Sequence, residues 1–78
     1  MKIKYTSHAM ERMKLRQITD KMVEETIFNP EKISEGYSNR KLAYRTYKEG
    51  LLKIVYTEKQ NEIIVISTIW EKRWKVWE

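Results

Sequence analysis

A histidine and two arginines stand at helical spacing near the start of the chain, in the stretch SHAMERMKLRQI (residues 7–18). His8 is the only histidine of the protein, and Arg12 and Arg16 follow it four and eight positions later. An imidazole titrates near neutral pH, and a guanidinium is a permanent cation. Together they suit phosphodiester cleavage, in which the imidazole moves a proton and the guanidinium stabilises charge on phosphorus. The alternative is that a lone histidine near a helix start is a surface or packing residue.

Helical geometry separates these side chains from the predicted core of the same helix. The predicted apolar stripe consists of Ala9, Met10 and Met13. On an ideal helix His8 and Arg12 lie about 40° apart, and the stripe centres about 150° from His8. We therefore expect His8 and Arg12 to point toward one solvent-accessible concavity, with Arg16 near its rim.

Two helices are expected before Pro30. Ser7 is the expected N-cap of the first, which should cover residues 8–16. Thr19 is the expected N-cap of the second, which must end near Asn29 because a proline follows.

Beyond Pro30 the sequence becomes rich in β-branched and aromatic residues, which favours strands. Long strands are predicted over residues 41–47, 51–57 and 62–70, with a short edge strand over 32–36. Turns are expected at Glu49-Gly50 and over residues 58–61. The predicted fold is a single α+β domain over residues 1–78. Its core, over about residues 3–70, has two N-terminal helices followed by a three- to four-stranded antiparallel sheet.

Alternation along these strands predicts two faces of the sheet. The face expected beneath the helices carries Ala43, Arg45, Tyr47, Leu52, Ile54, Tyr56, Ile63, Val65, Ser67 and Ile69. The opposite face carries Tyr44, Thr46, Lys48, Lys53, Ile64, Ile66, Thr68 and Trp70.

The net charge of +5 is distributed unevenly along the chain. Residues 1–18 hold five basic residues and one acidic residue, residues 20–35 are mainly acidic, and residues 40–53 are basic again. If the basic stretches meet, they form a face for a polyanion such as RNA, and Lys4, Lys48 and Lys53 are the expected phosphate contacts. The alternative is solvated charge that keeps a small protein soluble.

Composition also excludes several classes of protein. The chain has no cysteine, so neither a disulfide framework nor a Cys-based zinc site is expected, and a reducing cytoplasm is the predicted location. With one histidine no metal site is expected, and we predict no cofactor. No apolar run reaches the ~18 residues of a membrane span, and no signal peptide is expected.

The tail over residues 71–78 places tryptophans among basic residues. Trp74 and Trp77 follow Trp70, interleaved with Lys72, Arg73 and Lys75. Arg73 and Trp74 are candidates for stacking on and binding single-stranded RNA. The alternatives are that these tryptophans complete a thin core or form a homodimer contact.

The run His8-Ala9-x-x-Arg12-Met13-x-x-Arg16-x-Ile18-Thr19 closely resembles the opening of the bacterial and archaeal domain of unknown function numbered 4258. The segments 40–47, 52–56 and 65–70 resemble that family's three strands. The resemblance implies a compact fold allied to the RelE-like toxins and the wider barnase–EndoU–colicin–RelE ribonucleases, which cut RNA without metal. Carried onto this chain, it names His8, Arg12 and Arg16, with Thr68 and Tyr44 as weaker catalytic candidates.

The sequence therefore predicts a metal-free endoribonuclease of the toxin type, acting through attack of a ribose 2′-hydroxyl on the adjacent phosphate. Its expected partners are RNA and an antitoxin-like protein. Two alternatives stay open: a non-catalytic module that binds RNA or protein through the same basic face, and a small structural protein that dimerises through its tail.

Overall fold

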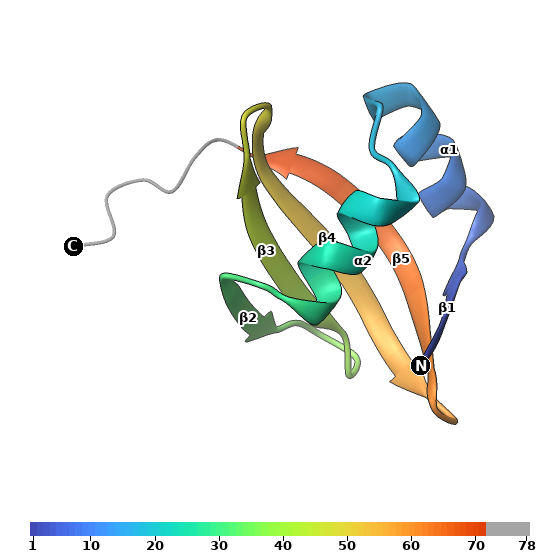
Figure 1. The fold of residues 1–78 in the computed structure, drawn as a ribbon. Helices are drawn as coiled ribbons and strands as arrows, with labels where there is room; N and C mark the ends of the chain where they lie inside the picture. The colour runs from blue at the N-terminus through green and yellow to red at the C-terminus, as the bar shows by residue number, and fades with distance from the viewer. Residues whose placement is uncertain (72–78) are drawn as a thin grey trace.

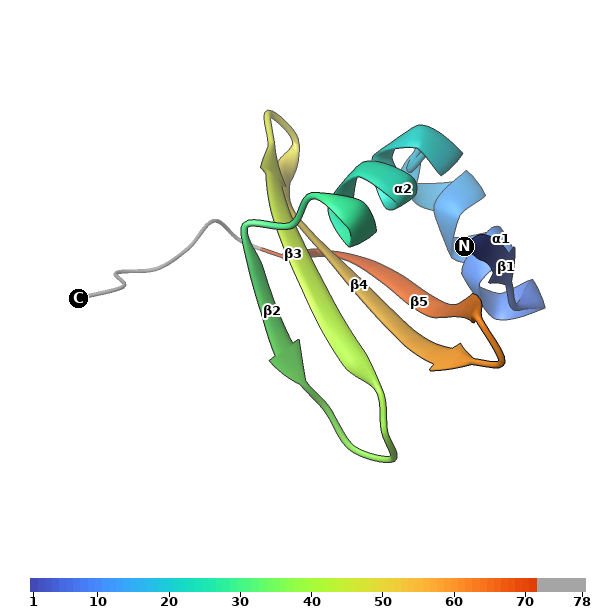
Figure 2. The ribbon, with the colours of Figure 1, turned by 60° about the horizontal axis from the view of Figure 1, so that its bottom comes forward.

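The computed structural model describes residues 1–71, and residues 72–78 lie outside the description. The elements follow the order β1 (Lys2–Tyr5), α1 (Ser7–Arg16), α2 (Asp20–Phe28), β2 (Lys32–Glu35), β3 (Lys41–Tyr47), β4 (Gly50–Lys59) and β5 (Glu62–Glu71). Both helices cover one face of a single twisted sheet (Figures 1 and 2). The other face of the sheet carries no helix from the described part of the chain.

Threonine side chains cap both helices. The Thr19 hydroxyl accepts a hydrogen bond from the Met22 backbone N–H at 3.1 Å, as expected for the N-cap of α2. Helix α1 is capped by Thr6, whose hydroxyl accepts from the Ala9 N–H at 3.0 Å, so the prediction of Ser7 as the cap is wrong by one residue. The two predicted helices are confirmed to within one residue at each end.

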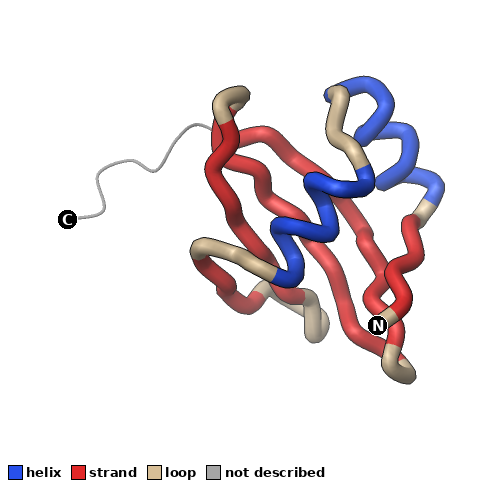
Figure 3. The backbone as a smooth tube through the Cα atoms, in the orientation of Figure 1, coloured by secondary structure: helices blue, strands red, loops and turns tan. Residues whose placement is uncertain are grey.

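The sheet contains five strands in the order β1-β5-β4-β3-β2 (Figure 3). Strand β1 runs parallel to β5, with Lys2 beside Glu62 and Tyr5 beside Val65, and the other neighbours are antiparallel. The predicted fold class, helices first and then an antiparallel sheet of three to four strands, is therefore wrong. The sheet is mixed, and its first strand precedes both helices.

The missed strand is β1, which is four residues long. Ile3 and Tyr5 pack against the core, whereas Lys2 and Lys4 are exposed. Four residues are too few for alternation to identify a strand, and the strand that pairs with β1 lies sixty positions away. Local sequence periodicity does not report such a distant pairing.

The two predicted hairpins form, but their turns are displaced. Tyr47 pairs with Gly50, so the first turn is Lys48-Glu49 and not Glu49-Gly50. Lys59 pairs with Glu62, which leaves a turn of two residues, Gln60 and Asn61, where four were expected. In both hairpins the pairing differs from the prediction by two residues, and such a shift leaves the faces of a strand unchanged.

A β-bulge interrupts the pairing of β4 with β5. Tyr56 pairs with Val65, but the preceding residue Val55 pairs with Ser67, so Ile66 is an extra residue in β5. A single extra residue reverses the alternation of every side chain that follows it. Each side chain of β5 after Ile66 therefore lies on the face opposite to the one predicted from simple alternation.

The bulge corrects the predicted faces at the end of β5. Thr68 stands beside Ile54 on the helix-covered face and is buried, and Trp70 turns to the same side and packs against the core. Ser67 and Ile69 turn to the uncovered face. The predicted positions of these four side chains were therefore wrong, because the prediction contained no bulge.

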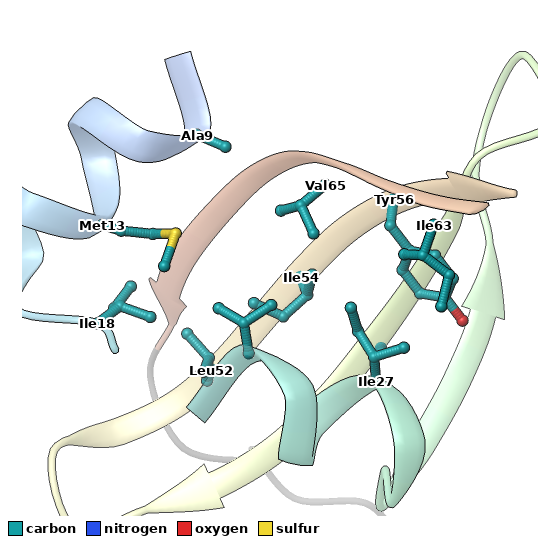
Figure 4. Packing of buried hydrophobic residues seen from close by; sticks show 11 residues of the cluster. Ala9, Met13, Ile18, Ile27, Leu52, Ile54, Tyr56, Ile63 and Val65 are labelled. Atoms are coloured by element: carbon teal, nitrogen blue, oxygen red, sulfur yellow. The ribbon is translucent and has the colours of Figure 1, made fainter. Parts of the chain in front are cut away.

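The core lies between the helices and the covered face of the sheet (Figure 4). It contains Ala9, Met13, Ile18, Val23, Ile27, Ala43, Leu52, Ile54, Tyr56, Ile63 and Val65. Met10, which was predicted to join the stripe of α1, is instead 59% exposed. The buried stripe of α1 is therefore narrower than the sequence suggested and consists of Ala9 and Met13.

Candidate functional site

His8, Arg12 and Arg16 all lie on α1, and their burial increases along the helix. His8 is exposed, whereas Arg12 and Arg16 are half-buried. Each step of four residues advances about 40° around a helix, so the line of three turns toward the stripe of Ala9 and Met13. On an ideal helix Arg16 lies about 40° from the centre of that stripe, and His8 lies about 120° from it.

The Arg12 side chain has no ion-pair partner within residues 1–71. Glu25, an acid of α2, is engaged elsewhere: it accepts a hydrogen bond from the Tyr47 hydroxyl at 2.6 Å and lies 3.8 Å from Arg45 Nε. An unpaired guanidinium beside an exposed imidazole leaves both groups available to an anionic ligand.

Arg16 has a different partner, the backbone of β5. Its Nη1 donates to the Thr68 carbonyl at 2.6 Å, and its own carbonyl accepts from Trp70 Nε1 at 3.1 Å. The Trp70 ring meets Tyr47 edge to face, with ring centroids 6.3 Å apart. At the other end of α1, the Thr6 hydroxyl donates to the Ile66 carbonyl. Hydrogen bonds therefore hold α1 to β5 at both ends.

These contacts supply hydrogen-bond donors to backbone carbonyls at an unpaired edge of the sheet. The pairing of β1 with β5 ends at Val65, and within the described chain no strand covers that side of β5 from Ile66 to Glu71. Thr6 and Arg16 bond two carbonyls along this stretch. Arg16 thus stabilises the position of α1, and its guanidinium is not directed at solvent alongside Arg12.

The two predicted hydroxyl groups lie on strands of the sheet, one on each face. Thr68 is fully buried, and its Oγ1 is enclosed without a hydrogen-bond partner in the described chain. Tyr44 pairs with Lys53 on the uncovered face, where the amine of Lys32 lies 5.9 Å from its ring centroid. His8 and Arg12 therefore lie one turn apart on α1, whereas Thr68 and Tyr44 lie on strands of the sheet.

The predicted RNA-binding residues are dispersed. Lys4 lies on β1 and pairs with Glu62 at 3.3 Å, and Lys53 lies on β4 and pairs with Glu71 at 3.0 Å. By register both lysines belong to the uncovered face of the sheet. Lys48 is exposed in the turn between β3 and β4. The remaining two, Arg73 and Trp74, lie outside the described residues.

Three tyrosine hydroxyls, those of Tyr5, Tyr47 and Tyr56, have raised pKa values, and the sequence singled out none of them as a site residue. Burial raises the pKa of Tyr5 to about 12, and the nearby carboxylates of Asp20 and Glu24 act in the same direction. Burial also raises the pKa of Tyr47, and its hydrogen bond to Glu25 adds to the effect. These phenols therefore stay protonated at neutral pH. Tyr47 donates to Glu25, whereas the buried Tyr5 hydroxyl has no hydrogen-bond partner in the described chain.

Two surface cavities are of interest among the residues that the structure describes. One, of about 390 Å³, is lined by Tyr5, Met10, Met13, Ile18, Thr19 and Asp20. The other, of about 220 Å³, is lined by Glu35, Asn39, Arg40, Lys41 and Glu58. Neither of these two cavities is lined by His8 or Arg12. Sequence reasoning missed both, because their walls come from separate elements.

Residues 1–71 contain no group of three histidine, aspartate or glutamate side chains placed to hold a metal ion. No helix in this part of the chain has the length and apolar character needed to cross a membrane.

Comparison with known proteins identifies a family. The sequence profile described as Domain of unknown function (DUF4258) matches residues 5–71. No curated protein and no solved structure gives a significant match. The matched range contains the whole of α1, both other catalytic candidates and four of the five strands in full. The resemblance carried by the run His8-Ala9-x-x-Arg12-Met13 is thus confirmed, and the chain belongs to this family of domains of unknown function.

Proposed function

We propose that this protein is an endoribonuclease of the toxin type that cleaves RNA without a metal ion, with His8 and Arg12 as its reacting groups. One observation carries the proposal: exposed His8 stands one helical turn from Arg12, whose guanidinium has no carboxylate partner in residues 1–71. A phosphodiester can approach both side chains from solvent. The suspected likeness to RelE-like toxins supports RNA as the substrate.

The reaction is an attack of the ribose 2′-oxygen on the adjacent phosphorus. A base removes the 2′-hydroxyl proton, the O2′–P bond forms, and the P–O5′ bond breaks as the 5′-oxygen receives a proton. The products are a 2′,3′-cyclic phosphate and a 5′-hydroxyl. Because the chain has one histidine, His8 performs one of these proton transfers and water the other. Arg12 stabilises the charge on the non-bridging oxygens.

A second function, binding of RNA without cleavage, is favoured by the positions of the other candidates. Arg16 is bonded to the backbone of β5, Thr68 is enclosed, and Tyr44 belongs to the uncovered face. These positions leave His8 as the single predicted proton-transfer group on α1. A binding module would use Arg12 in the same way and would not need an imidazole.

A cleavage assay distinguishes the two functions. Labelled single-stranded RNA is incubated with the wild type and with the His8→Ala, Arg12→Ala and Lys14→Ala variants, and the product termini are identified by mass spectrometry. We expect His8→Ala to lower the cleavage rate at least ~100-fold, the scale of a lost general acid or base. Lys14→Ala is the control, because it removes a cation of α1 on a different side of the helix.

Each possible result supports or contradicts one part of the proposal. Cleavage by His8→Ala at the wild-type rate would overturn the assignment of His8. If the wild type binds RNA and leaves it intact, and Arg12→Ala weakens that binding, the binding module is the correct account. Products that end in a 3′-phosphate without passing through a cyclic phosphate would contradict the proposed attack by the 2′-oxygen.

The toxin proposal has two further parts. A ribonuclease of this type is held inactive by an antitoxin-like protein, and it acts in the cytoplasm, in keeping with a chain that has no cysteine. The homodimer contact predicted for Trp74 and Trp77 lies outside the described residues.

A further inference from the structure

The larger cavity lies between α1 and the start of α2. Its volume of about 390 Å³ falls in the range of small-molecule sites. Met10 and Met13 contribute the wall on the α1 side, on a different flank of the helix from His8. On an ideal helix Met10 points about 160° away from His8 and Arg12, measured from each. The cavity is therefore separate from the proposed ribonuclease site.

The lining combines apolar walls with one carboxylate. Met10, Met13, Ile18 and the Tyr5 ring give an apolar surface, and Asp20, the first residue of α2, supplies the charge. Met10 is 59% exposed, so its side chain is accessible to a ligand from solvent. Methionine side chains are flexible and polarisable, and they adapt to ligands of different shape.

Two carboxylates lie near the Tyr5 side of this cavity, although the protein carries a net charge of +5. The pKa of Tyr5 is raised to about 12, chiefly by burial, and the carboxylates of Asp20 and Glu24 both raise it further. The cavity thus combines apolar walls with one carboxylate, that of Asp20. This combination is complementary to a cation that has an apolar body.

We propose that the cavity binds a small organic cation, with its ammonium at the Asp20 carboxylate and its apolar body against Met10, Met13 and Ile18. The apolar contacts supply most of the affinity, because an exposed ion pair contributes about 0.2–1 kcal/mol. The carboxylate selects a cation over a neutral molecule of the same shape. This site does not depend on the proposed ribonuclease activity.

Nuclear magnetic resonance titration of the full chain tests the site. Phenethylammonium is the probe, and 2-phenylethanol is its neutral counterpart of similar shape. We expect the ammonium to shift the amide signals of Tyr5 and of residues 18–20 and the methyl signals of Met10 and Met13. The alcohol should bind about threefold to fivefold more weakly, the scale of one exposed charge pair. Asp20→Asn should remove this preference, and Glu35→Gln, on distant β2, should keep it.

A second variant tests the site independently, in case the Asp20→Asn protein does not fold. Met10→Lys changes an exposed side chain and places a like charge at the cavity, so it should abolish the ammonium-induced shifts while the rest of the spectrum stays native. Equal binding of the ammonium and the alcohol to the wild type would overturn the proposal. So would shifts located elsewhere, the absence of shifts at 10 mM probe (roughly the weak limit for small ligands), or unchanged selectivity in folded Asp20→Asn.

Discussion

Among the three residues on the predicted line, Arg16 shows what spacing in a sequence can and cannot reveal. The interval of four residues correctly predicts that His8, Arg12 and Arg16 stand one turn apart along a helix. It does not reveal that Arg16 bonds to the carbonyl of Thr68, fifty-two positions away. The intrinsic turn of the helix carries the last residue of such a line toward the core, and tertiary contacts then decide its role.

Arg16 is therefore predicted to matter for stability. Arg16→Ala removes a charge-assisted hydrogen bond at 2.6 Å and leaves the Thr68 carbonyl without that donor. We expect a loss of about 1–3 kcal/mol in the free energy of unfolding, measured by urea denaturation. Arg12→Ala, on the same helix, should change this free energy by less than about 0.5 kcal/mol. Equal losses in the two variants would show that the contact of Arg16 with β5 contributes little.

At the scale of elements, regular segments were predictable and irregular ones were not. Both helices and the three long strands follow from period and turn residues. The bulge at Ile66 has no clear signal in the sequence, because no glycine stands near it in the strand. Its effect on the site is large, since it moves Thr68 and Trp70 to the side of α1. Strand β1 was not predicted, because β5, the strand that it pairs with, lies sixty positions away in the sequence.

The turn between β4 and β5 allows a stabilising substitution. Gln60 and Asn61 both have left-handed backbones, with φ of 52° and 64°. This conformation is costly for glutamine, whereas glycine adopts it freely. We expect Gln60→Gly to raise the free energy of unfolding by about 0.5–1 kcal/mol.

The adjacent residue provides the control for this substitution. Lys59 is the last residue of β4 and pairs with Glu62. Lys59→Gly should lower the stability, because glycine weakens a strand. If both glycine substitutions destabilise the protein, the turn does not carry the backbone strain inferred here.

At the scale of the whole molecule, the basic residues divide between two sides of the sheet. His8 and Arg12 belong to the side with the helices, and Lys4 and Lys53 belong to the uncovered face, each paired with a glutamate. The charge pattern of the sequence did not show this division, because it depends on strand register. An RNA strand that contacts α1 would not lie along the uncovered face at the same time.

The salt dependence of RNA binding tests which side is used. If RNA lies along α1, Arg12→Ala should lower the slope of log affinity against log salt by about 0.7, the value for one phosphate contact with a single strand. Lys53→Ala should leave that slope unchanged. The reverse result would locate RNA on the uncovered face, and it would separate RNA binding from His8.

The parallel pairing of β1 with β5 also has a mechanical consequence. The chain enters β1 at Lys2 and leaves β5 at Glu71, and these points lie at opposite ends of the paired strands (Figure 1). A pull applied between them runs along the strands, so it loads the hydrogen bonds of the pair in shear, all at once, and cannot open them one after another. We therefore expect the four paired positions of β1 and β5 to yield together when residues 2 and 71 are pulled apart.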